Sequence, residues 1–291
     1  MEELIKKADT LIEALPYIRE FHGQTVVIKY GGNAMVDEDL MASVLEDVTL
    51  LKYVGLKPVL VHGGGPAISQ NLEKLGVDSE FHRGLRVTSE EVMEVVEKVL
   101  IGKVNSQIVS LANLAGCKSV GLSGKDANLI KAKKYHPSEQ VDLGYVGEIK
   151  RINPKVLRSV IGDGYFPVVA PVGVDEEGNS YNINSDLVAG KIAAALEAEK
   201  LILLTNVEGI LADPEDEESL ISQLTDKEAK EMIKREQIVG GMIPKVNSCI
   251  QALEGGVHRT HILDGRIDHA LLLEIFTDQG IGTMIAKAID N

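Results

Sequence analysis

Short apolar runs alternate with amphipathic segments along most of the chain. Runs of four to seven residues that are mainly apolar are typical of buried strands, and apolar residues at steps of three and four are typical of helices packed on one face. The pattern predicts strands at 25–29, 57–62, 119–122, 166–172, 200–205 and 261–263, hairpins within 128–151, and helices at 3–22, 37–54, 67–75, 90–115, 154–161, 185–196, 225–234, 245–253 and 269–275.

Apolar strands that alternate with helices favour an α/β fold with a largely parallel sheet. Such sheets bind ligands at the carboxyl ends of their strands, and here that edge collects 29–32, 62–65 and 205–207. The first predicted helix, 3–22, carries an apolar stripe, and we expect Pro16 to bend or interrupt it.

Composition and charge narrow the function. The chain has 291 residues, 44% of them hydrophobic and 25% charged, which fits one or two globular domains. A net charge of −14 argues against binding to nucleic acids or anionic membranes, so an anionic ligand needs a local site. We expect a cytoplasmic protein, because the sequence has only two cysteines, no apolar run of about 20 residues and no signal-like N-terminus.

Two lysines beside glycine-rich turns are the strongest chemical signal. Lys29 precedes Gly31 and Gly32, whereas Lys245 follows Gly241, and a third turn occupies 63–65. Glycine lets backbone N–H groups approach an anion closely, and lysine adds a compact positive charge. Two such sites suggest a phosphoryl group held from both ends, although the sequence has neither a Walker A motif nor the protein-kinase motifs.

Two further polar segments have a structural and a functional interpretation. The segment 182–186 opens a helix, where one residue suffices as an N-cap, yet Asn182 and Asp186 could also face a ligand. Asp186 could hold both lysines through charge-assisted contacts. Arg86 lies in a short apolar segment, either as a packed surface residue or as a bidentate clamp on a carboxylate.

Together these motifs resemble the amino-acid kinase superfamily, and most closely its N-acetylglutamate kinase branch. The resemblance spans essentially the whole chain in order, through 29–35, 62–66, 84–88, 182–186, 240–245 and 280–285. It implies a three-layer αβα sandwich around a mainly parallel open sheet. It also implies an acceptor-binding lobe at 23–178 and an ATP-binding lobe at 179–291.

The resemblance implies an activity as well. The γ-phosphoryl group of ATP would move to the side-chain carboxylate of N-acetyl-L-glutamate, giving N-acetyl-L-glutamyl 5-phosphate, the second step of arginine biosynthesis. No protein base is needed, because that carboxylate is already ionised at neutral pH. Mg²⁺ would arrive with ATP and be held mainly by phosphate oxygens and water, so no metal-binding side chains are expected in the protein.

The resemblance also assigns roles to individual residues. Lys29 and Lys245 would stabilise the transition state, and Asp186 would organise both lysines. The phosphate-binding set would be Gly31, Gly32 and Gly241, and the substrate-binding set would be Gly64, Gly65, Arg86 and Asn182. Gly32, Gly64 and Gly65 would act through backbone N–H groups, and Arg86 would clamp the α-carboxylate of the acceptor.

The N-terminal segment 1–22 resembles that of the arginine-inhibited members of this family. In those proteins such helices interlace and join dimers into a hexameric ring, so we expect a homohexamer built as a trimer of dimers, with L-arginine as inhibitor. Candidates near an arginine site are Tyr17, His269, Glu274 and Gly282. The alternative is a helix that packs on its own domain.

Two other functions stay open at this point. One is a kinase for an N-acylated aminoadipate in lysine biosynthesis, because one extra methylene changes binding by only about 1–3 kcal/mol. The other is a non-catalytic arginine sensor on the same fold. The presence of Lys29, Asp186 and Lys245 argues against the sensor, because a sensor needs neither lysine.

Overall fold

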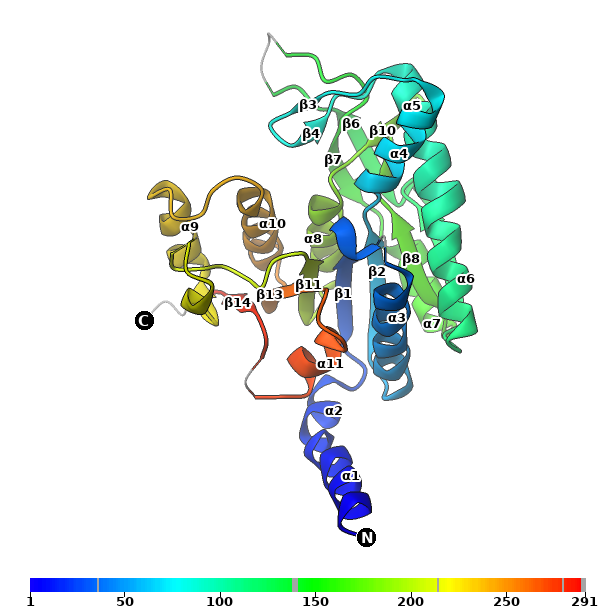
Figure 1. Ribbon diagram of the computed structural model, residues 1–291. Helices are drawn as coiled ribbons and strands as arrows, with labels where there is room; N and C mark the ends of the chain where they lie inside the picture. The colour runs from blue at the N-terminus through cyan, green and yellow to red at the C-terminus, as the bar shows by residue number, and fades with distance from the viewer. Residues whose placement is uncertain (36, 138–140, 214, 279, 289–291) are drawn as a thin grey trace.

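An eight-stranded sheet forms the middle of the molecule (Figure 1). The structure is a computed structural model that describes residues 1–35, 37–137, 141–213, 215–278 and 280–288. The strand order is β12-β14-β13-β11-β1-β2-β8-β5, and every neighbouring pair is parallel except β13 and β14. The bounds are Thr25–Tyr30 (β1), Lys57–His62 (β2), Ser119–Ser123 (β5), Phe166–Ala170 (β8), Lys200–Thr205 (β11), Gln223–Thr225 (β12), Arg259–Asp264 (β13) and Thr283–Ala286 (β14).

A smaller four-stranded sheet lies beyond one end of the large sheet, with the order β10-β9-β6-β7. Its β6 and β7 pair antiparallel, which confirms a hairpin within 128–151. The predicted strand 166–172 is divided at Pro171, so its last residue begins β9. The bounds are Ile130–Lys134 (β6), Gly147–Ile152 (β7), Val172–Val174 (β9) and Ser180–Asn182 (β10), and a two-stranded ladder joins Phe81–His82 (β3) to Leu85–Arg86 (β4).

The helices follow the predicted pattern, with one difference. The predicted helix 90–115 is a continuous run of α5, η2 and α6 whose middle part, η2, is a π-helix. The bounds are Glu2–Glu13 (α1), Leu15–Phe21 (α2), Glu38–Tyr53 (α3), Gly65–Leu75 (α4), Glu90–Glu97 (α5), Lys98–Asn105 (η2), Ser106–Leu114 (α6), Lys155–Gly162 (α7), Ser185–Leu196 (α8), Asp226–Lys234 (α9), Met242–Glu254 (α10) and Ala270–Ile275 (α11), with 3₁₀ turns at Gly32–Met35 (η1), Asp126–Asn128 (η3) and Glu217–Ser219 (η4).

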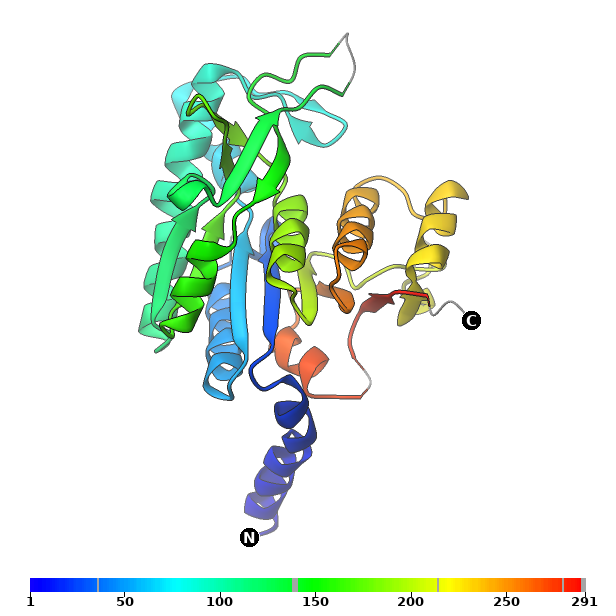
Figure 2. The ribbon, with the colours of Figure 1, turned by 180° about the vertical axis from the view of Figure 1, so that it is seen from behind.

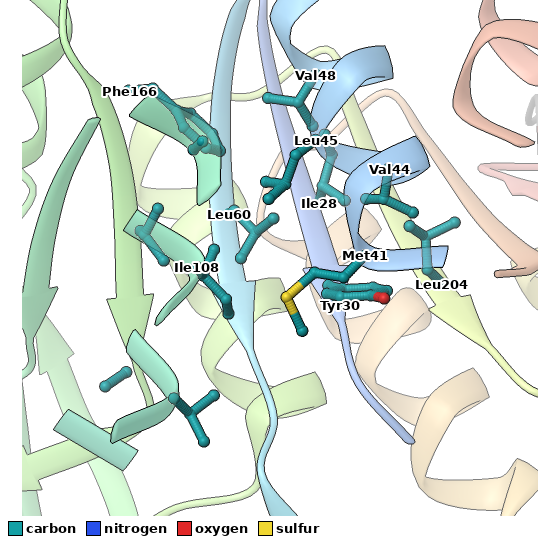
Figure 3. Close-up of a cluster of buried hydrophobic side chains, with 14 of the residues drawn as sticks. Ile28, Tyr30, Met41, Val44, Leu45, Val48, Leu60, Ile108, Phe166 and Leu204 are labelled. Atoms are coloured by element: carbon teal, nitrogen blue, oxygen red, sulfur yellow. The ribbon is translucent and has the colours of Figure 1, made fainter. Parts of the chain in front are cut away.

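Strand β1 shows how the sheet acquires two covered faces. Successive side chains of a strand point to opposite faces. Ile28 and Tyr30 belong to the core cluster that includes Leu45 of α3 (Figure 3), whereas Val27 belongs to the cluster that includes residues of α8 and α10. Figure 2 shows α7, α8 and α10 on this second face. The three-layer αβα sandwich is therefore confirmed, and the alternation directs Lys29 to the face covered by α8.

The N-terminal helices project from the body of the molecule (Figure 1). Ala14 separates α1 from α2, and Pro16 lies in the first turn of α2, so the predicted interruption is confirmed. The apolar side chains of α1 remain exposed, namely Leu4, Ile5, Leu11 and Ile12. None of the helices in the described ranges combines the length and the apolar character that crossing a membrane requires.

Candidate active site

Two glycine turns meet at the carboxyl edge of the large sheet. Strands β1 and β2 are parallel neighbours whose last residues, Tyr30 and His62, are paired. The turn after each strand therefore lies at the same edge, and the Gly63 N–H donates to the Tyr30 carbonyl at 2.7 Å. Helix α4 begins directly after the second turn, with Gly64 as its N-cap. Its N-terminal N–H groups add positive potential for an anion.

Gly31 leaves the room that the Lys29 side chain needs. A Cβ atom built on Gly31 would lie 2.6 Å from Nζ of Lys29, which is closer than real Cβ atoms approach another heavy atom. Any residue with a side chain at this position would displace the ammonium group. The glycine that follows β1 therefore leaves the space in which the ammonium group of Lys29 lies.

Asp186 lies between the two lysines. Its carboxylate is buried in the first turn of α8, with Nζ of Lys29 at 2.9 Å from Oδ1 and Nζ of Lys245 at 3.4 Å from Oδ2. The contact to Lys29 is an ion pair without hydrogen-bond alignment, so Oδ1 has no hydrogen-bond donor among the described residues. The structure thus brings together three side chains from β1, α8 and α10 that are far apart in the sequence.

The two ammonium groups keep Asp186 ionised. Burial by itself would raise the pKa of the carboxyl, but the charges of Lys29 and Lys245 outweigh burial and hold the pKa below its usual value. The local fold fixes the carboxylate, because the side chain of Asn184 caps α8 and accepts hydrogen bonds from the N–H groups of Asp186 and Leu187. Asn184 is thus the N-cap of this segment, which frees Asp186 for the lysines.

Arg86 lies beside the second glycine turn. Its guanidinium is buried, with Nη1 donating to Oγ of Ser79 at 2.6 Å and Nη2 donating to Oγ of Ser69 at 2.7 Å and to the Gly65 carbonyl at 3.3 Å. It also stacks 4.5 Å from the ring centroid of Phe81. Burial lowers the pKa of Arg86 from its very high ordinary value, yet the group stays charged. These hydrogen bonds hold the guanidinium plane in one orientation beside the second glycine turn.

A cavity of about 170 Å³ joins the predicted substrate-binding residues. Gly64, Gly65, Arg86 and Asn182 all line it. Asn182 donates to the hydroxyl of the buried Thr88 at 3.3 Å, so its amide is held at the cavity wall. The structure therefore places these four residues around one small cavity of mixed polar and apolar lining at the sheet edge.

A larger cavity, about 350 Å³, lies at the ends of the neighbouring strands. It is lined by apolar and polar side chains and by backbone, at Asn206, Val207, Glu208, Gly209, Ile210, Leu211, Gln237, Ile238, Val239, Met242 and Arg266. Met242 begins α10, directly after Gly241, and Lys245 follows in the same turn. The cavity therefore adjoins the helix that carries the second lysine.

A third cavity collects three of the four residues predicted near an arginine site. Tyr17, Glu274 and Gly282 line a cavity of about 410 Å³, together with the buried His261. His269 does not line this cavity. Its ring instead lies 2.6 Å from the buried carboxylate of Asp47, and this contact raises the pKa of His269.

Some residues around the site were not singled out from the sequence. Ser69 follows Gly65 by one helical turn and could have been inferred from the spacing on α4, whereas Ser79 lies in a loop where no pattern indicates it. His62 stood within a glycine motif, but its buried contact with Asn105 joins residues 43 positions apart. No local pattern predicts such a contact.

The chain is similar to known proteins over nearly its whole length. The family model described as "Amino acid kinase family" matches residues 24–264. The acetylglutamate kinase of Halothermothrix orenii is 56% identical over 288 residues, which cover 99% of each chain. That of Pelotomaculum thermopropionicum is 58% identical over 290 residues, which cover 97% of this chain and 98% of the relative.

A solved structure extends the comparison. The N-acetylglutamate synthase of Neisseria gonorrhoeae, complexed with coenzyme A and N-acetyl-glutamate, superposes with a TM-score of 0.87 at 30% identity. The match covers 97% of this chain but only 64% of the synthase, so the synthase contains a further part that this chain does not match. The same synthase complexed with coenzyme A and L-arginine superposes with a TM-score of 0.82 at 29% identity, covering 97% of this chain and 65% of the synthase.

Proposed function

We infer the mechanism of this chain from its family and from the geometry of its site. The chain belongs to the amino acid kinase family. It transfers the γ-phosphoryl group of ATP to the side-chain carboxylate of N-acetyl-L-glutamate. It is a phosphotransferase with a carboxyl group as acceptor. The single structural observation that carries the mechanism is the Asp186 carboxylate within ion-pair distance of both Lys29 and Lys245.

The two lysines supply the charge that the transition state needs. Phosphoryl transfer depends mainly on positioning and on neutralising charge that spreads over the phosphoryl oxygens. Lys29 acts from the acceptor side and Lys245 from the nucleotide side, while Asp186 holds both ammonium groups in place. Backbone N–H groups of Gly32 and Gly64 add further donors at the same edge. Because these groups are fixed before the substrate binds, no reorganisation is needed during the reaction.

We assign the two substrates to the two cavities at this edge of the large sheet. N-acetyl-L-glutamate binds in the smaller cavity, where Arg86 clamps its α-carboxylate and Asn182 contacts the acetylated end. The nucleotide binds in the larger cavity beside α10, with Gly241 near its phosphates. This division assigns acceptor binding to 23–178, extended by Asn182, and ATP binding to the remainder of 179–291.

Mg²⁺ accompanies ATP in this mechanism. Among the described residues, no group of three or more His, Cys, Asp or Glu side chains is arranged to hold a metal ion. A cation bound mainly by phosphate oxygens and water is compatible with such a site, because Mg²⁺ retains several waters and needs few protein ligands. The ion would neutralise phosphate charge, and the lysines would complete that neutralisation.

A coupled ADP-release assay with two acceptors tests the function. We expect turnover with N-acetyl-L-glutamate, and a kcat/KM for the N-acetylated aminoadipate that is lower by roughly 10- to 200-fold, which is what one methylene achieves. A preference for the longer acceptor would instead make the protein a kinase of lysine biosynthesis. Ligand binding without ADP release would make it a sensor.

Regulation by L-arginine is part of the proposal. The cavity lined by Tyr17, Glu274 and Gly282 offers the half-buried carboxylate of Glu274, which also contacts His261, to a cationic ligand. Tyr17 belongs to α2, directly after the projecting α1. The exposed apolar stripe of α1 must be covered by another surface, and pairing with its copy would join dimers into a closed hexamer. Arginine at this junction would then shift the ring toward a less active geometry. The expected location is the cytoplasm.

A further inference from the structure

A buried polar chain lies behind the second glycine turn. His62, the last residue of β2, is fully buried, and its Nδ1 lies 2.7 Å from the Gly63 carbonyl oxygen. Its Nε2 lies 3.1 Å from Nδ2 of Asn105, and the same Nδ2 donates to the Val168 carbonyl at 2.9 Å. Neither His62 nor Asn105 lines the cavity that contains Arg86.

The partners fix which atoms carry hydrogen. A carbonyl oxygen only accepts hydrogen bonds, so Nδ1 of His62 must carry the proton and donate to Gly63. Nε2 is then an acceptor, and the Asn105 amide must present its NH₂ group, which the Val168 carbonyl also requires. Burial lowers the pKa of His62 to about 4, so the ring is neutral at pH 7. The chain of donors therefore runs in one direction, from Asn105 through His62 to Gly63.

The surrounding fold makes room for this arrangement. Asn105 is the last residue of the π-helix η2, and a π-turn is a rare feature that is frequent at functional sites. On the neighbouring strand β5, a Cβ atom built on Gly121 would overlap Oδ1 of Asn105. The absence of a side chain at Gly121 thus lets the amide reach the end of β2.

The hydrogen bond to Gly63 also fixes the next N–H group. A peptide unit is planar and trans, so its carbonyl and the following N–H point in opposite directions. Holding the Gly63 carbonyl toward His62 therefore turns the Gly64 N–H away from His62. Within the described ranges, that N–H has no hydrogen-bond acceptor, and Gly64 lines the substrate cavity. It is available for an anionic ligand.

We propose that Asn105 and His62 form a positioning relay that holds the peptide between Gly63 and Gly64, so that the Gly64 N–H points at the phosphoryl group during transfer. The inference rests on the proposed phosphoryl-transfer function. Both residues act through the peptide and touch neither substrate, so they are positioning residues. Their effect belongs to the transition state, where charge on the phosphoryl oxygens is distributed and must be met by fixed donors.

Paired substitutions at His62 test the relay. His62→Leu removes the donor to Gly63, whereas His62→Asn places an amide NH₂ group close to the position of Nδ1. A single preorganised donor is worth roughly 10²–10³ in kcat, and a misoriented one retains part of that effect. We expect kcat to fall about 10- to 100-fold in His62→Leu, with both KM values within about threefold of wild type, and we expect His62→Asn to recover most of the loss.

Asn105 provides a second test of the relay in case the His62 variants do not fold. Asn105→Ala removes the donor to His62 and should lower kcat about tenfold with unchanged KM values. Thr260→Val is the matched control. Thr260 lies on the distant strand β13, is also fully buried, and donates to the carbonyl of Ile285 on β14 at 3.2 Å. The substitution should reduce thermal stability without changing kcat.

Different outcomes would refute the proposed function and the relay. Wild-type protein that releases no ADP with either acceptor would refute the proposed function. Wild-type activity combined with an unchanged kcat in a folded Asn105→Ala or His62→Leu variant would overturn the relay alone. A rise in the KM for N-acetyl-L-glutamate without a fall in kcat would also overturn it, because it would place the defect in acceptor binding.

Discussion

Removing the Asp186 carboxylate should destabilise the protein through the lysine that it leaves behind. Lys29 is only 6% exposed, and Asp186 is its ion-pair partner at 2.9 Å. At that distance, and with an effective dielectric constant of about 20, the attraction is about 6 kcal/mol, part of which is offset by desolvation of the two groups. Asp186→Leu should therefore lower the free energy of unfolding by about 3–5 kcal/mol, because a buried ammonium group remains.

The double variant Lys29→Met/Asp186→Leu should recover much of this loss. It removes both buried charges and replaces them with apolar side chains of similar volume, which is often close to neutral for stability. Lys245 also loses its partner, but a fifth of its side chain is exposed, so water can solvate it. We therefore expect the double variant to be more stable than Asp186→Leu by about 2–4 kcal/mol, and to remain as inactive as either single variant.

Urea unfolding of the wild type, both single variants and the double variant, at one fixed protein concentration, gives the coupling energy. The exposed pair of Lys230 and Glu254, 2.7 Å apart, is the matched control, and the same cycle there should show coupling near the measurement error. Additive losses for Lys29 and Asp186 would refute the reasoning, since they would mean that the carboxylate does not compensate the buried ammonium group. Activity in the double variant would remove Lys29 and Asp186 from the catalytic mechanism.

Four other outcomes are expected. Lys245→Ala should lower kcat by at least 100-fold and leave the KM for N-acetyl-L-glutamate within a few-fold, and steady-state kinetics at saturating ATP checks this. Arg86→Lys should raise the KM for the acceptor about tenfold with little change for ATP, since lysine loses the bidentate fork. Deletion of residues 1–22 should give active dimers that respond weakly to arginine. Light scattering measures the oligomeric state, activity assays with and without arginine measure the response, and persistent hexamers would contradict the prediction. The free energy of unfolding should fall by up to about 3 kcal/mol as the pH decreases from 6.5 to 4, because of His62. Its pKa of about 4 in the folded protein lies below the unfolded value, so the unfolded state binds the proton first. Urea unfolding of His62→Asn at pH 7 and 4.5 should lack this contribution.

The central part of the fold was predictable because its strands are covered on both faces. A strand such as β1 or β11 then becomes a nearly continuous apolar run, which the sequence shows directly. The short strands were not predicted. The four residues of β14 and the three of β12 lie at one edge of the sheet, and runs of that length cannot be distinguished from loop. Their place depends on contacts between segments about 60 residues apart.

The candidate site was predictable where chemistry and local geometry coincide. A glycine turn after a strand and a carboxylate in the first turn of a helix are both visible in the sequence, and they located Lys29 and Asp186 near each other. The direction of the His269 ring was not predictable in this way. His269 is a candidate near an arginine site only through the family resemblance, and its ring contacts Asp47 of α3, 222 positions away in the sequence. No local pattern indicates a contact over that separation.

The π-helix explains why the contribution of Asn105 could not be seen in the sequence. Periodicity in 90–115 predicts a helix, but it assumes a constant rotation of about 100° per residue. A π-turn contains more residues than an α-turn, so each side chain after it faces a different direction from the one that the α-helical period predicts. Asn105, the last residue of η2, is buried against β8 and β2 by this change of register. Rare backbone geometry of this kind is set by tertiary contacts, and it is here that a catalytic site gains positioning residues that no motif contains.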